Sequence, residues 1–192
     1  MSEPRQLRVV FVCTANIARS PYAERRAVSM LRDLPAFRFG SAGIPGHPGR
    51  PMDETMASVL GERGGASEGH ISRSVDWWTT ALADLVLTFE FAQHMRILDA
   101  FPNQAHKVLG LGQFADSAAR LLPSNPEEQP STLPDDPRER VLLAAAAAQP
   151  DSMTWDIADP YRRGISVARA CADQIDEALG RMVPLFTGRP GR

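Results

Sequence analysis

The chain contains only two cysteines, Cys13 and Cys171, among its 192 residues. Two cysteines do not indicate a disulfide framework, and a free thiol suits a reducing compartment. No apolar run approaches the roughly 20 residues that a membrane-spanning helix needs, and the first six residues do not resemble a signal peptide. A net charge of −2 gives no electrostatic support for nucleic-acid binding. We therefore expect a cytoplasmic protein without membrane insertion or nucleic-acid partner.

The four histidines show no metal-ligand spacing such as His-x-x-x-His, and no acidic cluster lies beside them. We therefore expect neither a metal nor a cofactor. Hydrophobic residues make up 43% of the chain and charged residues 23%, which is typical of a folded globular protein. This length suits one domain with a single sizeable core.

Short apolar segments alternate with helical patterns along most of the chain. Strands are expected at 7–12, 37–39, 84–89 and 106–110, and helices at 21–34, 52–63, 90–101, 112–121 and about 164–183. A shorter helix is expected after Asp76, a plausible N-cap. This rhythm predicts an α/β fold, a single domain with a four-stranded parallel sheet and helices on both faces. The loop after the first strand would lie at the switch point of the sheet.

The segment from Val9 to Pro21 indicates a chemical site. Four apolar residues form a buried strand, polar and small residues follow, and Ser20-Pro21 begins a helix. A tight loop between a strand and a helix directs backbone N–H groups and the positive end of the helix dipole toward one point. Such a nest binds a phosphate or an arsenate.

The loop begins with the thiol of Cys13 and ends with the guanidinium of Arg19. Facing a helix N-terminus and an arginine, the thiol should have its pKa lowered from about 8.5 to roughly 3.5–7.5, which makes it a nucleophilic thiolate. Arg19 can hold two phosphoryl oxygens at once, Ser20 can stabilise the sulfur, and Asn16 can pin the loop. A cysteine after a strand is often a simple core residue, but this context favours catalysis.

Residues 12–21 resemble the signature loop of the low-molecular-weight protein tyrosine phosphatases. Asp159-Pro160-Tyr161 resembles the motif that carries the general acid of that family, and Ser41-Ala42-Gly43 and Glu24 also match. Two residues depart from the family pattern. Ala18 stands where many members have a second cysteine, so a protective disulfide to Cys13 is not available. Ala15 stands where many have glycine, and alanine tolerates a left-handed backbone less well.

The resemblance implies a phosphotyrosine protein phosphatase I-like fold and hydrolysis of phosphotyrosine through a cysteinyl phosphate. Cys13, Arg19 and Asp159 would be the catalytic residues, with Asp156 as the rival acid. The phosphate would be bound by Thr14, Ala15, Asn16, Ile17, Ala18, Arg19 and Ser20. The pocket mouth would be lined by Ile17, His47 and Tyr161, and a supporting network would consist of Asn16, Glu24, Ser41 and His70. Taken alone, His70 is more simply a structural histidine.

Two other functions fit the same residues. An arsenate reductase on this scaffold would need an external thiol, because Cys171 lies in the middle of an apolar helix pattern and is a poor resolving cysteine. A non-catalytic phosphotyrosine-binding module would be favoured if Ala15 distorted the loop.

The resemblance implies a phosphotyrosine-bearing protein as partner, such as a tyrosine kinase, and a monomer or weak dimer.

Three further features of the sequence carry expectations. We expect one phosphatase-like domain over residues 1–192, with a Pro/Ala-rich insertion at about 116–153 that could be a lid, a dimer contact or a docking surface. Neighbouring residues on a helix point in different directions, so at least one of Trp77 and Trp78 is expected in the core. Arg162 and Arg163 could attract acidic residues around a phosphotyrosine, although a solvated helix start is the simpler account.

Overall fold

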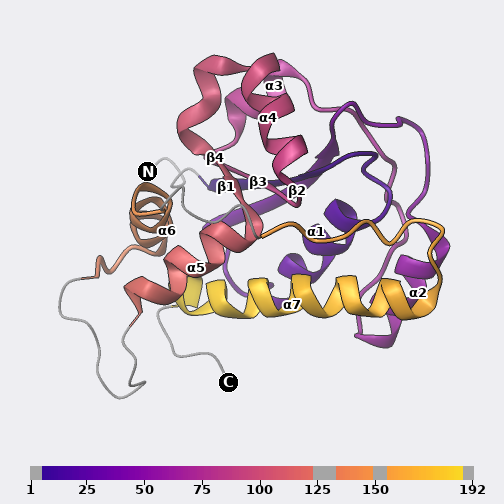
Figure 1. The fold of residues 1–192 in the computed structure, drawn as a ribbon. Helices are drawn as coiled ribbons and strands as arrows, with labels where there is room; N and C mark the ends of the chain where they lie inside the picture. Colours follow the sequence, from indigo (N-terminus) through magenta and orange to yellow (C-terminus); the bar gives the residue numbers. More distant parts are fainter. Residues whose placement is uncertain (1–5, 123–132, 149–154, 188–192) are drawn as a thin grey trace.

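The computed structural model describes residues 6–122, 133–148 and 155–187 (Figure 1). Its strands are β1 (Leu7–Cys13), β2 (Phe37–Gly43), β3 (Leu85–Thr88) and β4 (Val108–Gly110). Its helices are α1 (Arg19–Met30), α2 (Glu54–Glu62), α3 (Trp77–Leu82), α4 (Phe91–Ala100), α5 (Leu111–Leu121), α6 (Pro137–Ala146) and α7 (Ile165–Thr187), and Pro102–Lys107 forms a 3-10 helix.

The four strands form one parallel sheet in the order β2-β1-β3-β4. β1 lies inside the sheet, with β2 on one side and β3 on the other. The chain therefore runs from β1 toward one edge of the sheet, to β2, and from β3 toward the other edge, to β4. Parallel sheets form binding sites at the carboxyl ends of two neighbouring strands whose connections diverge in this way. The predicted α/β class, the parallel sheet and its helices are confirmed.

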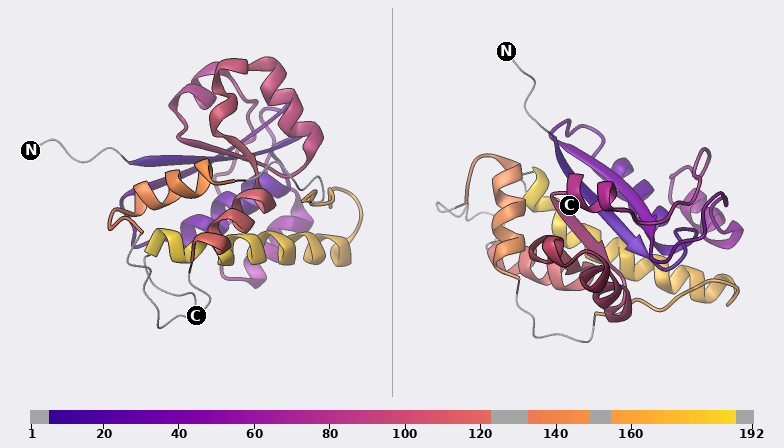
Figure 2. Two further views of the ribbon diagram at one scale, coloured as in Figure 1. Left: turned by 60° about the vertical axis from the view of Figure 1, so that its left-hand side comes forward. Right: turned by 90° about the horizontal axis from the view of Figure 1, so that it is seen from above.

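β1 contributes to both layers of the core because its side chains alternate. Val9, Phe11 and Cys13 belong to the larger apolar cluster, whereas Val10 and Val12 belong to a smaller cluster on the other face. Figures 1 and 2 show α3 and α4 above the sheet and α1, α2, α5 and α7 below it. The apolar residues of β1 thus hold the loop after the strand from both sides of the sheet.

A charged cluster joins α1, α2 and α7 beneath the sheet. The Asp176 carboxylate of α7 accepts hydrogen bonds from the Tyr22 hydroxyl at 3.1 Å, from Arg26 Nε at 3.0 Å and from Arg63 Nη1 at 2.8 Å. Burial and the negative charge of Asp176 raise the pKa of the Tyr22 hydroxyl above its ordinary value. Tyr22 therefore stays protonated and α1, which begins at Arg19, is held against α7.

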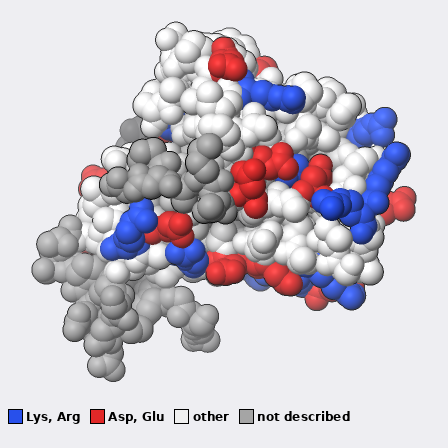
Figure 3. All heavy atoms as spheres, in the orientation of Figure 1, with Lys and Arg blue, Asp and Glu red and all other residues white. Residues whose placement is uncertain are grey.

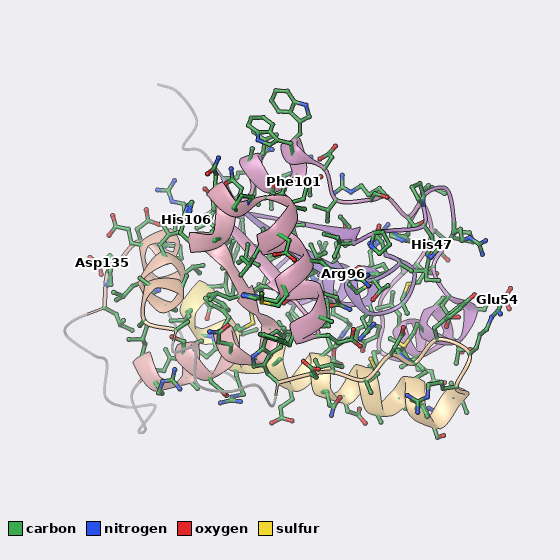
Figure 4. The ribbon with its side chains drawn as sticks, turned by 45° about the horizontal axis from the view of Figure 1, so that its top comes forward. His47, Glu54, Arg96, Phe101, His106 and Asp135 are labelled. Carbon is green, nitrogen blue, oxygen red and sulfur yellow. The ribbon has the colours of Figure 1, made fainter. Side chains whose placement is uncertain are left out.

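Part of the predicted 116–153 insertion is helical and packs against the far end of the molecule. α6 contacts α5 and α7; Ser117 Oγ donates to the Ala144 carbonyl at 2.7 Å and Arg140 Nε to the Leu185 carbonyl at 2.7 Å. Figure 4 shows Asp135, just before α6, and His47 at opposite ends of the molecule. Residues 123–132 and 149–153 of the insertion lie outside the described residues.

Several sequence expectations differ from the structure. The strand expected at 37–39 continues to Gly43, and the helix expected at 21–34 ends at Met30. The prediction that Trp77 or Trp78 would be in the core is wrong: their side chains are 54% and 64% exposed. α3 has only six residues and buries Thr80, so the two indoles instead stack edge to face on each other at 4.7 Å. α7 also continues past the predicted end at 183 and includes Pro184. In the described ranges, no helix has the length and apolarity needed to cross a membrane.

Candidate active site

The loop that joins β1 to α1, residues 13–20, is called the Cys13 loop below. Asn16, at its centre, is fully buried and has a left-handed backbone with φ of +60°. Asparagine is one of the few non-glycine residues that tolerate this conformation. The left-handed residue is therefore Asn16, and the concern that Ala15 would have to adopt this conformation is removed.

The predicted network of polar side chains surrounds Asn16. Its Nδ2 donates to Ser20 Oγ at 3.0 Å and to Ser41 Oγ at 2.9 Å, and Ser41 Oγ donates to Glu24 Oε2 at 2.5 Å. His70 Nε2 lies 2.8 Å from the Asn16 carbonyl oxygen. The structure thus brings together the four residues Asn16, Glu24, Ser41 and His70. The backbone N–H of Arg73, which sequence reasoning missed, donates to Asn16 Oδ1 at 2.9 Å.

β2 ends close beneath the loop. A Cβ atom on Gly43 would lie 2.9 Å from both the Ala15 carbonyl carbon and the Asn16 nitrogen. Only glycine therefore fits this position without moving the loop. The Ser41-Ala42-Gly43 motif serves two purposes here: Ser41 bonds to Asn16, and Gly43 allows the backbones to approach closely.

The Cys13 side chain is 2% exposed, and its Sγ lies 3.0 Å from Ser20 Oγ. The Ser20 hydroxyl accepts a hydrogen bond from Asn16 and has one proton of its own to donate, either to this sulfur or to the Ala42 carbonyl at 3.2 Å. A negatively charged sulfur is the stronger acceptor of the two. The geometry therefore allows Ser20 to stabilise a Cys13 thiolate.

Arg19 is 1% exposed, and its guanidinium is held from one side. Both protons of Nη1 are used, toward Glu90 Oε1 at 2.5 Å and the Ile157 carbonyl at 2.7 Å. Nη2 lies 3.3 Å from Asp159 Oδ2, and Nε is buried without a hydrogen-bond partner among the described residues. This leaves Nε and Nη2, the two donors on one edge of the fork, to bind a planar pair of oxygens.

The charge of Arg19 is secured by its surroundings. Burial acts to lower the pKa of the guanidinium, but the negative charges of Cys13, Glu90 and Asp159 together with the Glu90 hydrogen bond outweigh burial and raise this pKa above its ordinary value. A site for a doubly charged oxyanion needs a cation that stays charged although it is buried. Several anionic partners keep Arg19 charged even when one of them is protonated.

The segment before α7, residues 155–164, is called the Asp159 loop. The Asp159 side chain is 47% exposed, and its Oδ1 accepts a hydrogen bond from the Tyr161 backbone N–H at 3.2 Å. Asp156 has a different role, since its Oδ1 accepts the Phe91 N–H at 2.8 Å, at the first turn of α4. Of the two acids considered from the sequence, Asp159 is the one that lines a cavity together with Cys13 and Arg19.

Both loops line one cavity of about 360 Å³. It includes all three residues predicted for the pocket mouth, Ile17, His47 and Tyr161, together with Cys13, Arg19 and Asp159. Two arginines that the sequence analysis did not assign to the pocket, Arg50 and Arg162, also line it. The cavity therefore has a thiol and a guanidinium from the Cys13 loop and a carboxyl group from the Asp159 loop.

Sequence reasoning missed the residues that brace the site from β3. Glu90 comes two residues after the strand, accepts a hydrogen bond from Arg19, and accepts another from the Gln93 side-chain amide at 2.8 Å. Gln93 in turn donates to Thr14 Oγ1 at 3.1 Å. The position of Glu90 just past a parallel strand next to β1 was the available signal, because such strand ends meet at one edge of a sheet. Among the side chains that the structure describes, no group of His, Cys, Asp and Glu could hold a metal ion.

Comparisons with known proteins agree with this geometry. The chain is 32% identical over 108 residues to the low molecular weight protein-tyrosine-phosphatase Etp of Escherichia coli K12, covering 56% of this chain and 71% of that protein. The fold matches a low molecular weight protein tyrosine phosphatase from T. tengcongensis with a TM-score of 0.69 at 23% identity, covering 93% of this chain and 98% of the other.

A third similar protein is the YwlE arginine phosphatase from Geobacillus stearothermophilus, with a TM-score of 0.67 and 26% identity over 92% of this chain and 90% of the other. Residues 8–126 match the family described as low molecular weight phosphotyrosine protein phosphatase. This match covers more than half of the chain and contains the whole Cys13 loop. The chain therefore belongs to the low molecular weight phosphotyrosine protein phosphatase family.

Proposed function

We propose that this protein hydrolyses phosphotyrosine in proteins, with Cys13 as nucleophile, Arg19 as phosphoryl-binding group and Asp159 as general acid and base. The observation that carries the proposal is the arrangement of Arg19. One edge of its guanidinium is held by Glu90 and Ile157, and the other edge, beside Cys13 and Asp159, keeps two donors for oxygens of a phosphoryl group.

In the first step the Cys13 thiolate attacks phosphorus, and an S–P bond forms as the P–O bond to the tyrosyl oxygen breaks. Asp159 gives its proton to that oxygen, so tyrosine leaves as a neutral phenol. General acid catalysis of this kind contributes about 10²–10⁴-fold to the rate. Backbone N–H groups of the loop and Arg19 stabilise the charge on the equatorial oxygens.

In the second step water attacks the cysteinyl phosphate. The Asp159 carboxylate takes a proton from this water, the S–P bond breaks, and Cys13 leaves as a thiolate to which Ser20 can donate a hydrogen bond at the observed 3.0 Å. Inorganic phosphate is released, and Asp159 is again protonated for the next cycle. The step needs no metal ion or other cofactor, because the leaving group is a stabilised sulfur anion.

The alternative function, arsenate reduction, would need a second thiol. Cys171 is buried in α7, and burial raises the pKa of its thiol to about 12. A protonated, buried thiol is a poor nucleophile toward a cysteine adduct. An arsenate reductase built on this chain would therefore depend on an external thiol.

The proposal also covers the partner, the cellular location and the domain organisation of the protein. A protein carrying phosphotyrosine, such as a tyrosine kinase, is the proposed partner, and the cytoplasm is the proposed location because its reducing conditions preserve a free thiol. We further propose that residues 1–192 form one phosphatase domain, in which α6, the described helix of the 116–153 insertion, braces α5 and α7 at the end away from the cavity.

A substrate panel tests the function. Purified protein is offered a phosphotyrosine peptide, a phosphoarginine peptide, and arsenate with an added thiol, and Cys13→Ala serves as the inactive control. We expect hydrolysis of the phosphotyrosine peptide by the wild type and none by the variant. Turnover of phosphoarginine alone, reduction of arsenate alone, or binding of the phosphotyrosine peptide without turnover would each contradict the proposal and favour the corresponding alternative.

A further inference from the structure

The Asp159 loop contains a turn that has arginine at a position where glycine is usual. The backbone N–H of Arg163 donates to the Pro160 carbonyl at 3.0 Å, which closes a four-residue turn from Pro160 to Arg163. Its third residue, Arg162, has φ of +59°. A left-handed third residue is favoured in turns of this kind when it is glycine or asparagine.

Arginine in this position carries a cost. A left-handed backbone costs a residue with a Cβ atom about 1–2 kcal/mol. Glycine would avoid this cost, and the neighbouring Gly164, with φ of +86°, has this conformation without it. Strained residues of this type persist at functional sites, where the side chain is needed in a particular place.

The strained backbone places the Arg162 guanidinium at the mouth of the cavity. Its central carbon lies 5.0 Å from the centre of the Tyr161 ring, a cation–π contact, and both residues line the cavity. Arg50, from the loop between β2 and α2, also lines it. Arg163 does not belong to the described residues around the cavity, although it is adjacent in sequence.

The mouth therefore has two cations from two different loops. Among the described residues that line the cavity, Asp159 is the one acidic side chain, and it is already assigned to proton transfer. Figure 3 shows several Arg side chains at the right-hand end of the molecule, with some acidic side chains beside them. The positive charge of the cavity lining contrasts with the net charge of −2 for the whole chain.

We propose that Arg162 and Arg50 form a cationic rim that selects phosphotyrosines flanked by acidic residues. The proposal rests on the phosphatase activity proposed above and specifies its substrate class. The phosphoryl group would bind at Arg19 on the cavity floor, the tyrosine ring would lie beside Tyr161 and Ile17, and carboxylates of neighbouring residues would reach the two rim guanidiniums. Each exposed ion pair contributes roughly two- to fivefold to binding, and salt weakens it.

The test compares three phosphotyrosine peptides of equal length with acidic, neutral or basic flanking residues. The readout is the ratio of kcat/KM for the acidic peptide to that for the neutral one, because a general loss of turnover cancels in this ratio. We expect a ratio of several-fold for the wild type. The ratio should be roughly two- to fivefold smaller in Arg162→Gly, and near one in the double variant Arg162→Gly/Arg50→Ala. High salt should reduce the wild-type ratio toward one.

The variants are chosen to separate charge from structure. Arg162→Gly keeps the turn, since glycine prefers the left-handed backbone. Arg162→Lys keeps the charge and should retain most of the preference. Arg163→Ala removes an equal charge one residue away, outside the cavity, and should leave the ratio unchanged. A wild-type ratio of one, or an equal drop in Arg163→Ala and Arg162→Gly, would overturn the proposal.

Binding measurements keep this test independent of the proposed activity. The Cys13→Ser variant is titrated with the same labelled peptides, and binding is followed by fluorescence anisotropy. A preference for the acidic peptide without any hydrolysis by the wild type would refute the phosphatase but support the rim. Hydrolysis of all three peptides with equal kcat/KM and equal binding would refute the rim but support the phosphatase.

Discussion

Two non-glycine residues of the described chain have a left-handed backbone, and one lies in each loop of the cavity. Asn16 in the Cys13 loop is fully buried and bonded to Ser20, Ser41, His70 and the Arg73 backbone. Arg162 in the Asp159 loop is exposed, and its side chain contacts the ring of Tyr161. The first conformation is held by many contacts, and the second by one turn and one cation–π contact.

This difference matches what each loop must do. Charge on a transferring phosphoryl group is stabilised by donors that are in place before the reaction, so the Cys13 loop benefits from rigidity. A general acid must instead reach the leaving oxygen of whichever substrate is bound, and a half-exposed carboxyl on a lightly held loop can adjust. The comparison therefore predicts that changes in the two loops will have different kinetic signatures.

The largest effect is expected from Asp159→Asn, which removes the proton donor. We expect kcat/KM to fall by about 10²–10⁴-fold with phenyl phosphate, whose leaving group needs a proton. This constant reports the first step alone, and not the later hydrolysis in which Asp159 acts as base. The loss should be much smaller with p-nitrophenyl phosphate, because nitrophenolate is a stable anion. Steady-state kinetics with both esters measures the difference.

Asp156→Asn is the matched control for this prediction. Asn is as good a helix cap as Asp, so the contact with the Phe91 N–H is preserved. Its rates should stay close to those of the wild type. A loss in Asp156→Asn that depends on the leaving group would instead assign the proton donor to Asp156.

A smaller loss, independent of the leaving group, is expected from Arg19→Lys. A lysine ammonium cannot hold Glu90 and also present two donors in a plane. Removing a donor to a developing oxyanion costs about 10²–10³-fold in kcat. The loss should be equal for phenyl and p-nitrophenyl phosphate, because charge on the equatorial oxygens does not depend on the leaving group. Unequal losses would contradict the proposal that the Cys13 loop stabilises phosphoryl charge while the Asp159 loop transfers the proton.

The two left-handed residues should respond differently in stability. Asn16→Ala combines an unfavourable backbone with the loss of buried hydrogen bonds and should lower the free energy of unfolding by about 2–4 kcal/mol. Arg162→Gly should remain within about 1 kcal/mol of the wild type, because relief of strain and the added freedom of the unfolded chain nearly cancel. Urea unfolding measures both. An equal loss in the two variants would show that the loops are held equally firmly.

The smallest effect concerns the second cysteine. The raised pKa of Cys171, about 12, keeps its thiol protonated throughout the range from neutral pH to mildly alkaline pH, and the residue is buried. Iodoacetamide should therefore modify Cys13, which lines the cavity, and spare Cys171 until the protein is unfolded in urea. Peptide mapping measures this. Equal labelling of both thiols in the folded protein would show that α7 opens readily.

The sequence was sufficient for the parts of the site that are contiguous. Cys13, Asn16, Arg19 and Ser20 lie within eight residues, and the strand and helix around them are local features. Strand and helix order also predicted the parallel sheet, since apolar segments alternate with helical patterns throughout. The pairing of Asp159 with this loop came from a family resemblance, because nothing in a local pattern relates positions so far apart.

The residues that brace the site could not be read from the sequence. Glu90 and the Ile157 carbonyl reach Arg19 only after β3 and the Asp159 loop pack beside β1. Arg162 violates the local preference of its turn, so a turn rule would place glycine there. Trp77 and Trp78 were assigned by helix geometry alone, and α3 is too short to bury either.

The central claim is that phosphorus is transferred to the sulfur of Cys13. The direct measurement is rapid acid quenching of the wild type during turnover of p-nitrophenyl phosphate, followed by peptide mass spectrometry. The account predicts one phosphoryl group, attached to the peptide that contains Cys13 and missing in Cys13→Ala. A phosphoryl group on a histidine or another residue, or continued hydrolysis by Cys13→Ala, would contradict it.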